Sequence, residues 1–252
     1  MIRMLWALLG LSAMLRGAPV PAPEIRELTR AIYKQLIEIN TTTSDGDTTV
    51  AARAMAERLQ QAGIPAADLQ VLGPVEKRGN LVARLRGTGP RKPLLLLAHL
   101  DVVDARREDW TMDPFVLTEK DGYFYGRGTT DDKASAAVYV AMLIRFLREG
   151  YRPDRDIILA LTADEENGDH NGVEWLTAQH RELIDAAYGL NEGGDGQELN
   201  GRKTLLEVQA SEKVYLTFHL TTENRGGHSS LPRRDNAIYE LARALSRVEQ
   251  LR

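Results

Sequence analysis

The sequence predicts an α/β fold in which a mixed sheet is flanked by helices on both faces. Along residues 24–190, apolar runs of strand length alternate with segments of helical spacing. The run Leu94–Ala98 is apolar without a break, which is typical of a strand covered on both sides. After Asn200 the pattern changes to longer alternating strands and one amphipathic helix, which predicts a second region of its own.

The first third of the chain is predicted to hold two helices and a strand. Apolar residues at helical spacing over 24–39 predict the first helix, and a polar loop follows it. Asp47 is expected to cap a second helix that runs through Leu59 and stops at Gly63. Residues 80–85 alternate like a strand.

The later elements follow from the same patterns. The central part of the chain is predicted to contain strand 94–98, strand 123–125, helix 132–149, strand 156–162, helix 173–183 and strand 187–190. The last part is predicted to contain strand 204–210, strand 213–222 and helix 236–251.

Composition limits the possible functions. The formal net charge is -4, and no basic run is longer than a pair such as Arg106-Arg107, so the chain carries no electrostatic footprint for nucleic acid. There is no cysteine, and a metal ion would therefore have to be held by His, Asp and Glu side chains.

The amino terminus predicts export to the periplasm or the outside of the cell. Arg3 precedes the apolar run Met4–Leu11, which is much shorter than the ~20 residues of a membrane-spanning helix and matches the core of a signal peptide. Residues 20–22 suit a cleavage site, although Pro23 would follow the cut. We expect residues 1–23 to be a signal peptide, or an uncleaved anchor that tethers the protein to a membrane, with a proline-rich spacer. A mis-assigned start codon is the alternative and would leave a cytoplasmic protein.

Four short motifs carry the chemistry. They follow predicted strands or turns and supply one imidazole and several carboxylates, which is the mixed ligand set that suits a pair of zinc-like ions. The four motifs are His99-Leu100-Asp101, the segment 126–133 (GRGTTDDK), Asp164-Glu165-Glu166, and the segment 191–194 (NEGG).

Each motif taken alone has a plainer interpretation. His99 follows a predicted strand, and Asp101 can orient its ring, but this pattern taken alone favours a structural histidine. Asp131 can bridge two cations, or it can complement the dipole of the following helix together with Asp132.

The acidic pair after the strand 156–162 is similarly open to two interpretations. One carboxylate of Glu165-Glu166 can bind metal while its neighbour takes a proton from water, or both can belong to an acidic surface loop. Glu192 follows a short strand and is a plausible ligand of low specificity.

The order of the four motifs closely resembles that of the M20 family of metallopeptidases and aminoacylases. The segments Trp110–Phe115 and Gly226–Pro232 are also similar to that family, and the resemblance extends over about residues 25–252. It implies a zinc-exopeptidase-like fold and a two-zinc hydrolase that cleaves the amide bond of a peptide or an N-acyl amino acid. Co²⁺ or Mn²⁺ would be alternative metals.

The resemblance also assigns roles to residues. His99 and Glu192 would bind one zinc ion, Asp131 would bridge both ions, and Glu166 would bind the other. Glu165 would be the general base.

Further roles lie outside this group. Asp101 would orient His99, and His228 would stabilise the oxyanion, commonly across a dimer. Many relatives have Asp where this chain has Asn191. Family members hold a cis peptide after the bridging aspartate, here between Asp131 and Asp132.

For the domains, the resemblance implies a catalytic domain over residues 24–210 and the beginning of a lid or dimerisation domain over residues 211–252, from about Ser211. We expect the homodimer to form through the lid domain. The family's last histidine ligand has no counterpart among the five histidines, so we expect a chain truncated at its carboxyl end. The alternatives are a non-catalytic relative that binds peptide or metal without turnover, and an interaction domain whose acidic loops never meet.

Overall fold

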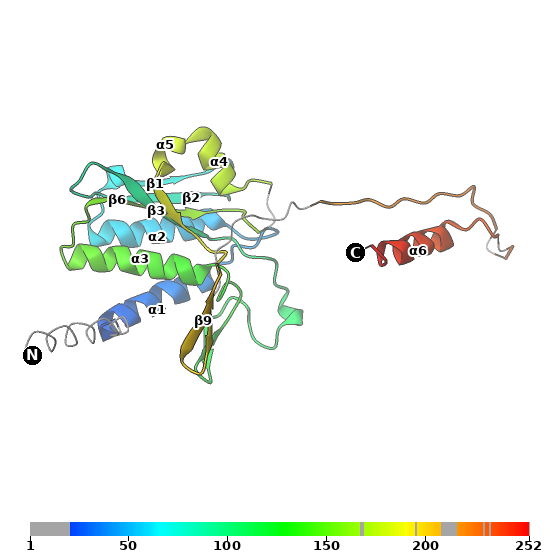
Figure 1. Cartoon of the computed structure of the whole chain (residues 1–252), viewed down its shortest axis with the longest axis horizontal. Coiled ribbons are helices and arrows are strands. Elements are labelled where there is room, and N and C mark those ends of the chain that lie inside the picture. Colours follow the sequence, from blue (N-terminus) through cyan, green and yellow to red (C-terminus); the bar gives the residue numbers. More distant parts are fainter. Residues whose placement is uncertain are drawn as a thin grey trace, which may run out of the picture. The chain divides into compact units, whose positions relative to one another are not determined.

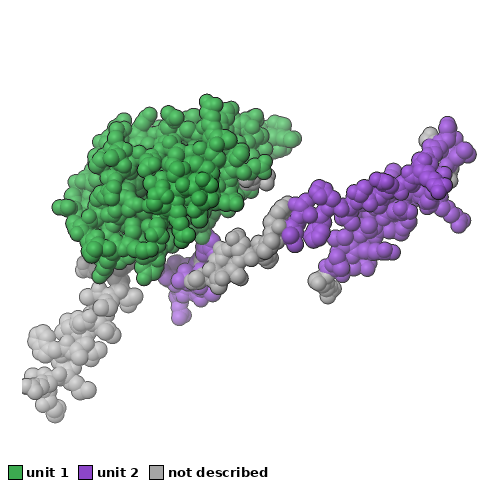
Figure 2. All heavy atoms as spheres, turned by 90° about the horizontal axis from the view of Figure 1, so that it is seen from above, with its two compact units in different colours: residues 1–192 green, residues 193–252 purple. Residues whose placement is uncertain are grey.

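The computed structural model describes residues 21–166, 169–194, 196–207, 216–228, 230, 231 and 233–251. The chain divides into two compact units, Met1–Glu192 and Gly193–Arg252 (Figure 2). Both the segment predicted as a signal peptide or anchor, up to residue 20, and the predicted boundary at Ser211 lie outside the described residues. In the described part, no helix is long and apolar enough to cross a membrane.

A five-stranded mixed sheet is the centre of the first unit. Its order is β1 (Leu69–Leu72), β2 (Asn80–Leu85), β6 (Arg155–Thr162), β3 (Arg91–His99) and β7 (Tyr188–Leu190). β2 is antiparallel to both of its neighbours, whereas β3 runs parallel to β6 and to β7. The mixed sheet confirms the predicted fold class.

Helices cover both faces of this sheet (Figure 1). One face carries α1 (Pro23–Glu38), α2 (Thr48–Ala62) and α3 (Lys133–Arg148), and the other carries α4 (Gly172–Gln179) and α5 (Arg181–Ile184). Successive strand residues point to opposite faces, so Leu81 and Ala83 pack in the larger cluster while Val82 packs in the smaller one. The central strands are therefore apolar on both sides.

The predicted caps of α2 are confirmed. The Asp47 carboxylate accepts hydrogen bonds from the amides of Thr49 (2.8 Å) and Val50 (3.3 Å), which satisfies two free donors of the first turn. At the other end, Gly63 has φ +116°, a left-handed conformation that ends the helix.

The prediction of one helix over 173–183 is wrong, because two helices occupy this segment. His180 leaves the helical region with φ -143°, and its ring packs against Trp175 at 4.7 Å between centroids. The break turns the chain so that Leu183 and Ile184 reach the smaller core cluster. Packing of side chains distant in sequence therefore decides where α4 ends.

Two short hairpins and two 3-10 turns lie outside the five-stranded sheet. They are η1 (Ala66–Asp68), η2 (Arg107–Asp109), the pair β4 (Thr118–Lys120) and β5 (Tyr123–Tyr125), and the pair β8 (Gly196–Leu199) and β9 (Arg202–Leu206). The strand predicted at 123–125 is confirmed, whereas β1, β4 and β8 were not predicted.

The second unit holds the β8–β9 hairpin and α6 (Ala237–Val248). The Asn236 side chain caps α6 by accepting from the amide of Ile238 at 2.9 Å. β9 includes residues 204–206 of the strand expected at 204–210, of which residues 208–210 lie outside the described part of the chain. The strand predicted over 213–222 is wrong for residues 216–222, because this segment pairs with no other strand in the described residues.

Candidate metal centre

Three parallel strands bring their carboxyl ends to one edge of the sheet. β3 ends at His99, which lies opposite Thr162, the last residue of β6. β7 pairs with β3 on the other side, with Leu190 opposite Leu96. Side chains that follow these strand ends therefore meet in one crevice, as in other open α/β sheets.

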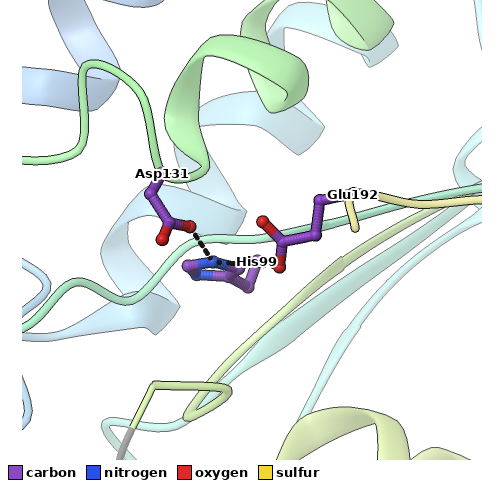
Figure 3. Close-up of side chains that lie close together, drawn as sticks. All are labelled: His99, Asp131 and Glu192. Carbon is purple, nitrogen blue, oxygen red and sulfur yellow. Dashed lines mark hydrogen bonds and ion pairs between the residues drawn. The ribbon is translucent and has the colours of Figure 1, made fainter. Parts of the chain in front are cut away.

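His99, Asp131 and Glu192 converge at these strand ends (Figure 3). His99 Nε2 lies 2.7 Å from Asp131 Oδ1 and 3.6 Å from Glu192 Oε1. One ligand atom from each of the three residues lies within 4.8 Å of the other two. The imidazole is buried, whereas Asp131 and Glu192 are exposed.

Asp101 lies behind the imidazole. Its backbone carbonyl oxygen is 3.0 Å from His99 Nδ1, whereas its carboxylate Oδ1 is 3.6 Å away. The carbonyl therefore makes the closer contact with the ring. Asp101 Oδ2 accepts a hydrogen bond from the amide of Glu166 at 3.0 Å, so the buried side chain holds the next motif.

The two glutamates after β6 occupy different positions. Glu165 Oε2 lies 4.0 Å from His99 Nε2, and its side chain is 49% exposed, so water can reach it. Glu166 does not belong to the three-residue ligand group. Burial and the charge of Asp131 raise the pKa of Glu166, which places its carboxyl group in the same negative field.

The negative electrostatic potential at these strand ends favours a bound cation. Burial by itself would lower the pKa of His99, but Asp101, Asp131 and Glu192 raise it to about 10. Burial and neighbouring carboxylates raise the pKa of Glu192 to about 7. Both groups retain protons to offset negative charge, and a divalent cation would offset it in their place. The donor set of one imidazole and several carboxylates fits zinc.

Lys133 makes no ion pair with these carboxylates in the described part of the chain. Its side chain is fully buried, and Nζ donates to the carbonyl oxygens of Leu36 at 2.8 Å and Ile39 at 2.9 Å. It thereby binds the start of α3 to the end of α1. A lysine at the start of a helix usually lies in solvent, so its burial here does not follow from the sequence pattern.

The backbone of the loop that carries Asp131 agrees with the prediction from the family. The peptide between Asp131 and Asp132 is cis, which confirms that expectation. Gly128 has φ +87°, and an added Cβ would lie 2.9 Å from side-chain atoms of Lys133 and Val102. Only glycine fits at this position.

His228 belongs to the second unit and is exposed. Its Nδ1 lies 2.7 Å from the Ser230 hydroxyl. Ser229 and Pro232 of the same motif lie outside the described residues.

The comparison with protein families is decisive about class. Residues 95–249 match the model of the peptidase family M20/M25/M40, which is more than half of the chain. The chain therefore belongs to this family of metallopeptidases.

Curated relatives extend the comparison. The N-fatty-acyl-amino acid synthase/hydrolase PM20D1 of Xenopus tropicalis is 38% identical over 162 residues, which cover 63% of this chain and 32% of the relative. PM20D1.1 of Danio rerio is 33% identical and matches 93% of this chain and 47% of its own length. Aminoacylase-1 of Mus musculus is 29% identical, over 90% of this chain and 54% of the relative. The chain spans about a third to a half of the length of these relatives.

Solved structures agree on the fold. Human carnosine dipeptidase 1 superposes with a TM-score of 0.52 at 22% identity, covering 69% of this chain and 41% of the other. An M20 family metallo-carboxypeptidase of Sulfolobus solfataricus gives 0.53 at 19% identity, covering 66% and 37%. At these identities the likeness concerns the fold alone.

Proposed function

We propose that this chain is part of a metal-dependent hydrolase that cleaves the amide bond of a peptide or an N-acyl amino acid. The observation that carries the proposal is the convergence of His99, Asp131 and Glu192 within 4.8 Å at the carboxyl end of parallel strands. The family, and the amide chemistry in the names of its relatives, support the same reaction.

The residues of the crevice divide into ligands and supports. His99, Asp131 and Glu192 would hold one zinc-class ion, and Glu166 with Asp131 would hold a second. When bound, such ions supply Lewis acidity and lower the pKa of water. The Asp101 carbonyl orients His99 by fixing which ring nitrogen carries the proton.

Proton transfer falls to Glu165. It is the half-exposed carboxylate beside the ligand group, at 4.0 Å from His99 Nε2. It would accept a proton from the attacking water and return it to the leaving nitrogen, as a general base and then a general acid. We assign His228 to the developing oxyanion of the substrate carbonyl, where its ring would donate a hydrogen bond.

The substitution Glu165→Gln tests this assignment in the complete gene product. Because Glu165 is not a ligand in this proposal, the variant should bind as much zinc per chain as the wild type. Turnover of N-acyl amino acids and dipeptides should fall by about 10²–10⁴-fold, the usual contribution of a general base. Metal analysis and steady-state kinetics measure the two effects.

Glu149→Gln is the matched control, since Glu149 is an exposed glutamate at the end of α3 that pairs with Arg145 at 2.7 Å. It should leave both zinc content and turnover unchanged. Turnover of Glu165→Gln within a factor of three of the wild type would refute the role of Glu165.

A further inference from the structure

Arg78 joins three loops beside the candidate centre. It lies between β1 and β2, and its side chain is only 12% exposed. Its Nε lies 2.9 Å from Asp164 Oδ1, while Nη2 donates to Thr43 O at 2.6 Å and Nη1 to Gly46 O at 3.1 Å. One guanidinium therefore connects the α1–α2 loop with the segment that follows β6. The planar donor fork of arginine suits such a position, and lysine could not make all of these contacts.

The loop that carries Arg78 is itself fixed to α2. The amide of Thr48 donates to Lys77 O at 3.1 Å, and the amide of Gly79 donates to the Thr49 hydroxyl at 2.8 Å. The same hydroxyl donates to Glu76 O at 2.6 Å. These hydrogen bonds thus fix the backbone that carries the guanidinium, which is not a mobile surface charge.

Asp164 requires this partner for two reasons. Its side chain is 2% exposed, and a buried carboxylate needs an opposite charge or hydrogen-bond donors to remain ionised. Its backbone has φ +55°, a conformation that L-residues seldom adopt unless neighbouring groups stabilise it. Arg78 supplies that opposite charge and lowers the pKa of Asp164, although burial, the larger effect, still leaves this pKa above its usual value.

The segment 163–166 is held at each side of Glu165. Asn80 Oδ1 accepts from the amide of Ala163 at 2.9 Å, Arg78 holds Asp164, and Asp101 Oδ2 accepts from the amide of Glu166 at 3.0 Å. The direction in which the Glu165 carboxylate leaves the backbone is set by these neighbours. Within this set the Arg78–Asp164 pair acts on the residue directly before Glu165.

We propose that Arg78 is a positioning residue for catalysis, which acts through Asp164 to hold the Glu165 carboxylate in its reactive place. This inference rests on the proposed function of Glu165 as general base. Arg78 itself would touch neither substrate nor metal.

The experiment is a double-substitution cycle in the complete, zinc-loaded gene product. Arg78→Gln should lower kcat about 10- to 100-fold, because misplacement of a catalytic group by about 1 Å costs that much. KM and zinc content should stay within about twofold, since no ligand changes. Arg78→Lys keeps the charge beside Asp164 and should recover part of kcat.

The Glu165→Gln background distinguishes a positioning role of Arg78 from a merely structural one. In that background Arg78→Gln should cause no further loss of kcat, because its effect passes through Glu165. A further loss equal to that seen in the wild-type background would overturn the proposal. So would a kcat of Arg78→Gln within threefold of the wild type. If Glu165→Gln alone were fully active, the proposed function would fail first.

Two more variants keep the test informative if Arg78→Gln folds poorly. Asp164→Asn is nearly isosteric and removes the charge from the other side of the pair, so it should lower kcat like Arg78→Gln even where the latter folds poorly. Arg91→Gln is the matched control, because Arg91 pairs with Asp154 at 2.7 Å with both side chains 64% exposed, at the opposite end of β3. It should leave kcat unchanged, and an equal loss in this control would overturn the proposal.

Discussion

At the scale of single residues, the candidate centre is defined by how its charges are balanced. One buried imidazole faces the carboxylates of Asp131 and Glu192, and the carbonyl of Asp101 contacts its far side. Sequence patterns could identify these residue types, because their order along the chain is that of the family. They could not distinguish the carbonyl of Asp101 from its carboxylate as the closer contact of the ring. A difference of less than 1 Å depends on the local backbone path.

Proton release on zinc binding is the residue-scale prediction. With a pKa of about 10, His99 carries a proton at pH 7–8 when no metal is bound, whereas an imidazole ligand must be neutral. Binding should therefore release close to one proton from His99, and Glu192, with a pKa of about 7, should add a fraction below that pH. Zinc affinity should rise about tenfold per pH unit between pH 7 and 9. Calorimetry in buffers of different ionisation enthalpy measures the proton count.

His180→Gln is the control for this titration, because His180 lies beyond α4 and away from the ligand group. It should leave the proton count unchanged. An affinity that stays constant from pH 7 to 9 would show that His99 is already neutral in the metal-free protein and would contradict its raised pKa.

At the scale of elements, local chemistry made some boundaries predictable and tertiary packing decided others. The ends of α2 could be predicted because Asp47 and Gly63 act on the adjacent turns alone. The break between α4 and α5 could not, since it follows from the contact of His180 with Trp175 and from the core cluster below. β1 escaped prediction because Leu69–Leu72 is a short edge strand with only partial burial.

The first turn of α4 gives an element-scale prediction. Gly172 starts this helix against the sheet, and an added Cβ would lie 1.9 Å from Asn80 Oδ1 and 2.9 Å from Ala163 N. Gly172→Ala should therefore lower the free energy of unfolding by ~1–3 kcal/mol, the usual cost of overpacking a tight contact. Urea denaturation measures the change.

Gly189→Ala in β7 is the companion variant, because its Cβ would meet no atom within 4 Å. The urea concentration at the midpoint of its unfolding should equal that of the wild type. Equal stability of the two alanine variants would mean that the α4 start can shift to relieve the clash.

At the scale of the whole molecule, the first unit contains its own core. Among the described residues, the buried hydrophobic side chains run from Ile32 to Leu176, so the second unit contributes none of them. Alternation of strand and helix predicted this layered unit well. For the second unit, the alternating character of residues 213–222 predicted a strand, but residues 216–222 form none, and most of their side chains are exposed, so no burial holds a strand there.

Independent folding of the first unit is the whole-molecule prediction. A fragment of residues 21–192 should unfold in urea as one cooperative transition at the midpoint of the full chain. Its m-value should be nearly unchanged, because m scales with the surface that folding buries. Circular dichroism along a urea gradient measures both quantities.

A shorter fragment, residues 21–162, serves as the negative control because it lacks α4, α5 and β7 and with them one face of the sheet's cover. It should lose the sharp transition. A broad, non-cooperative curve for 21–192 would show that residues 193–252 belong to the same folding unit.

The edge strand β7 links the candidate metal centre to the stability of the sheet. It joins β3 through only three register pairs, and its side chains are exposed, yet Glu192 follows directly from it. An ion shared by His99 and Glu192 would cross-link the ends of these two neighbouring strands. Ion binding would then oppose local opening of β7, the strand that the backbone alone holds least firmly. Opening of β7 would in turn release the ion.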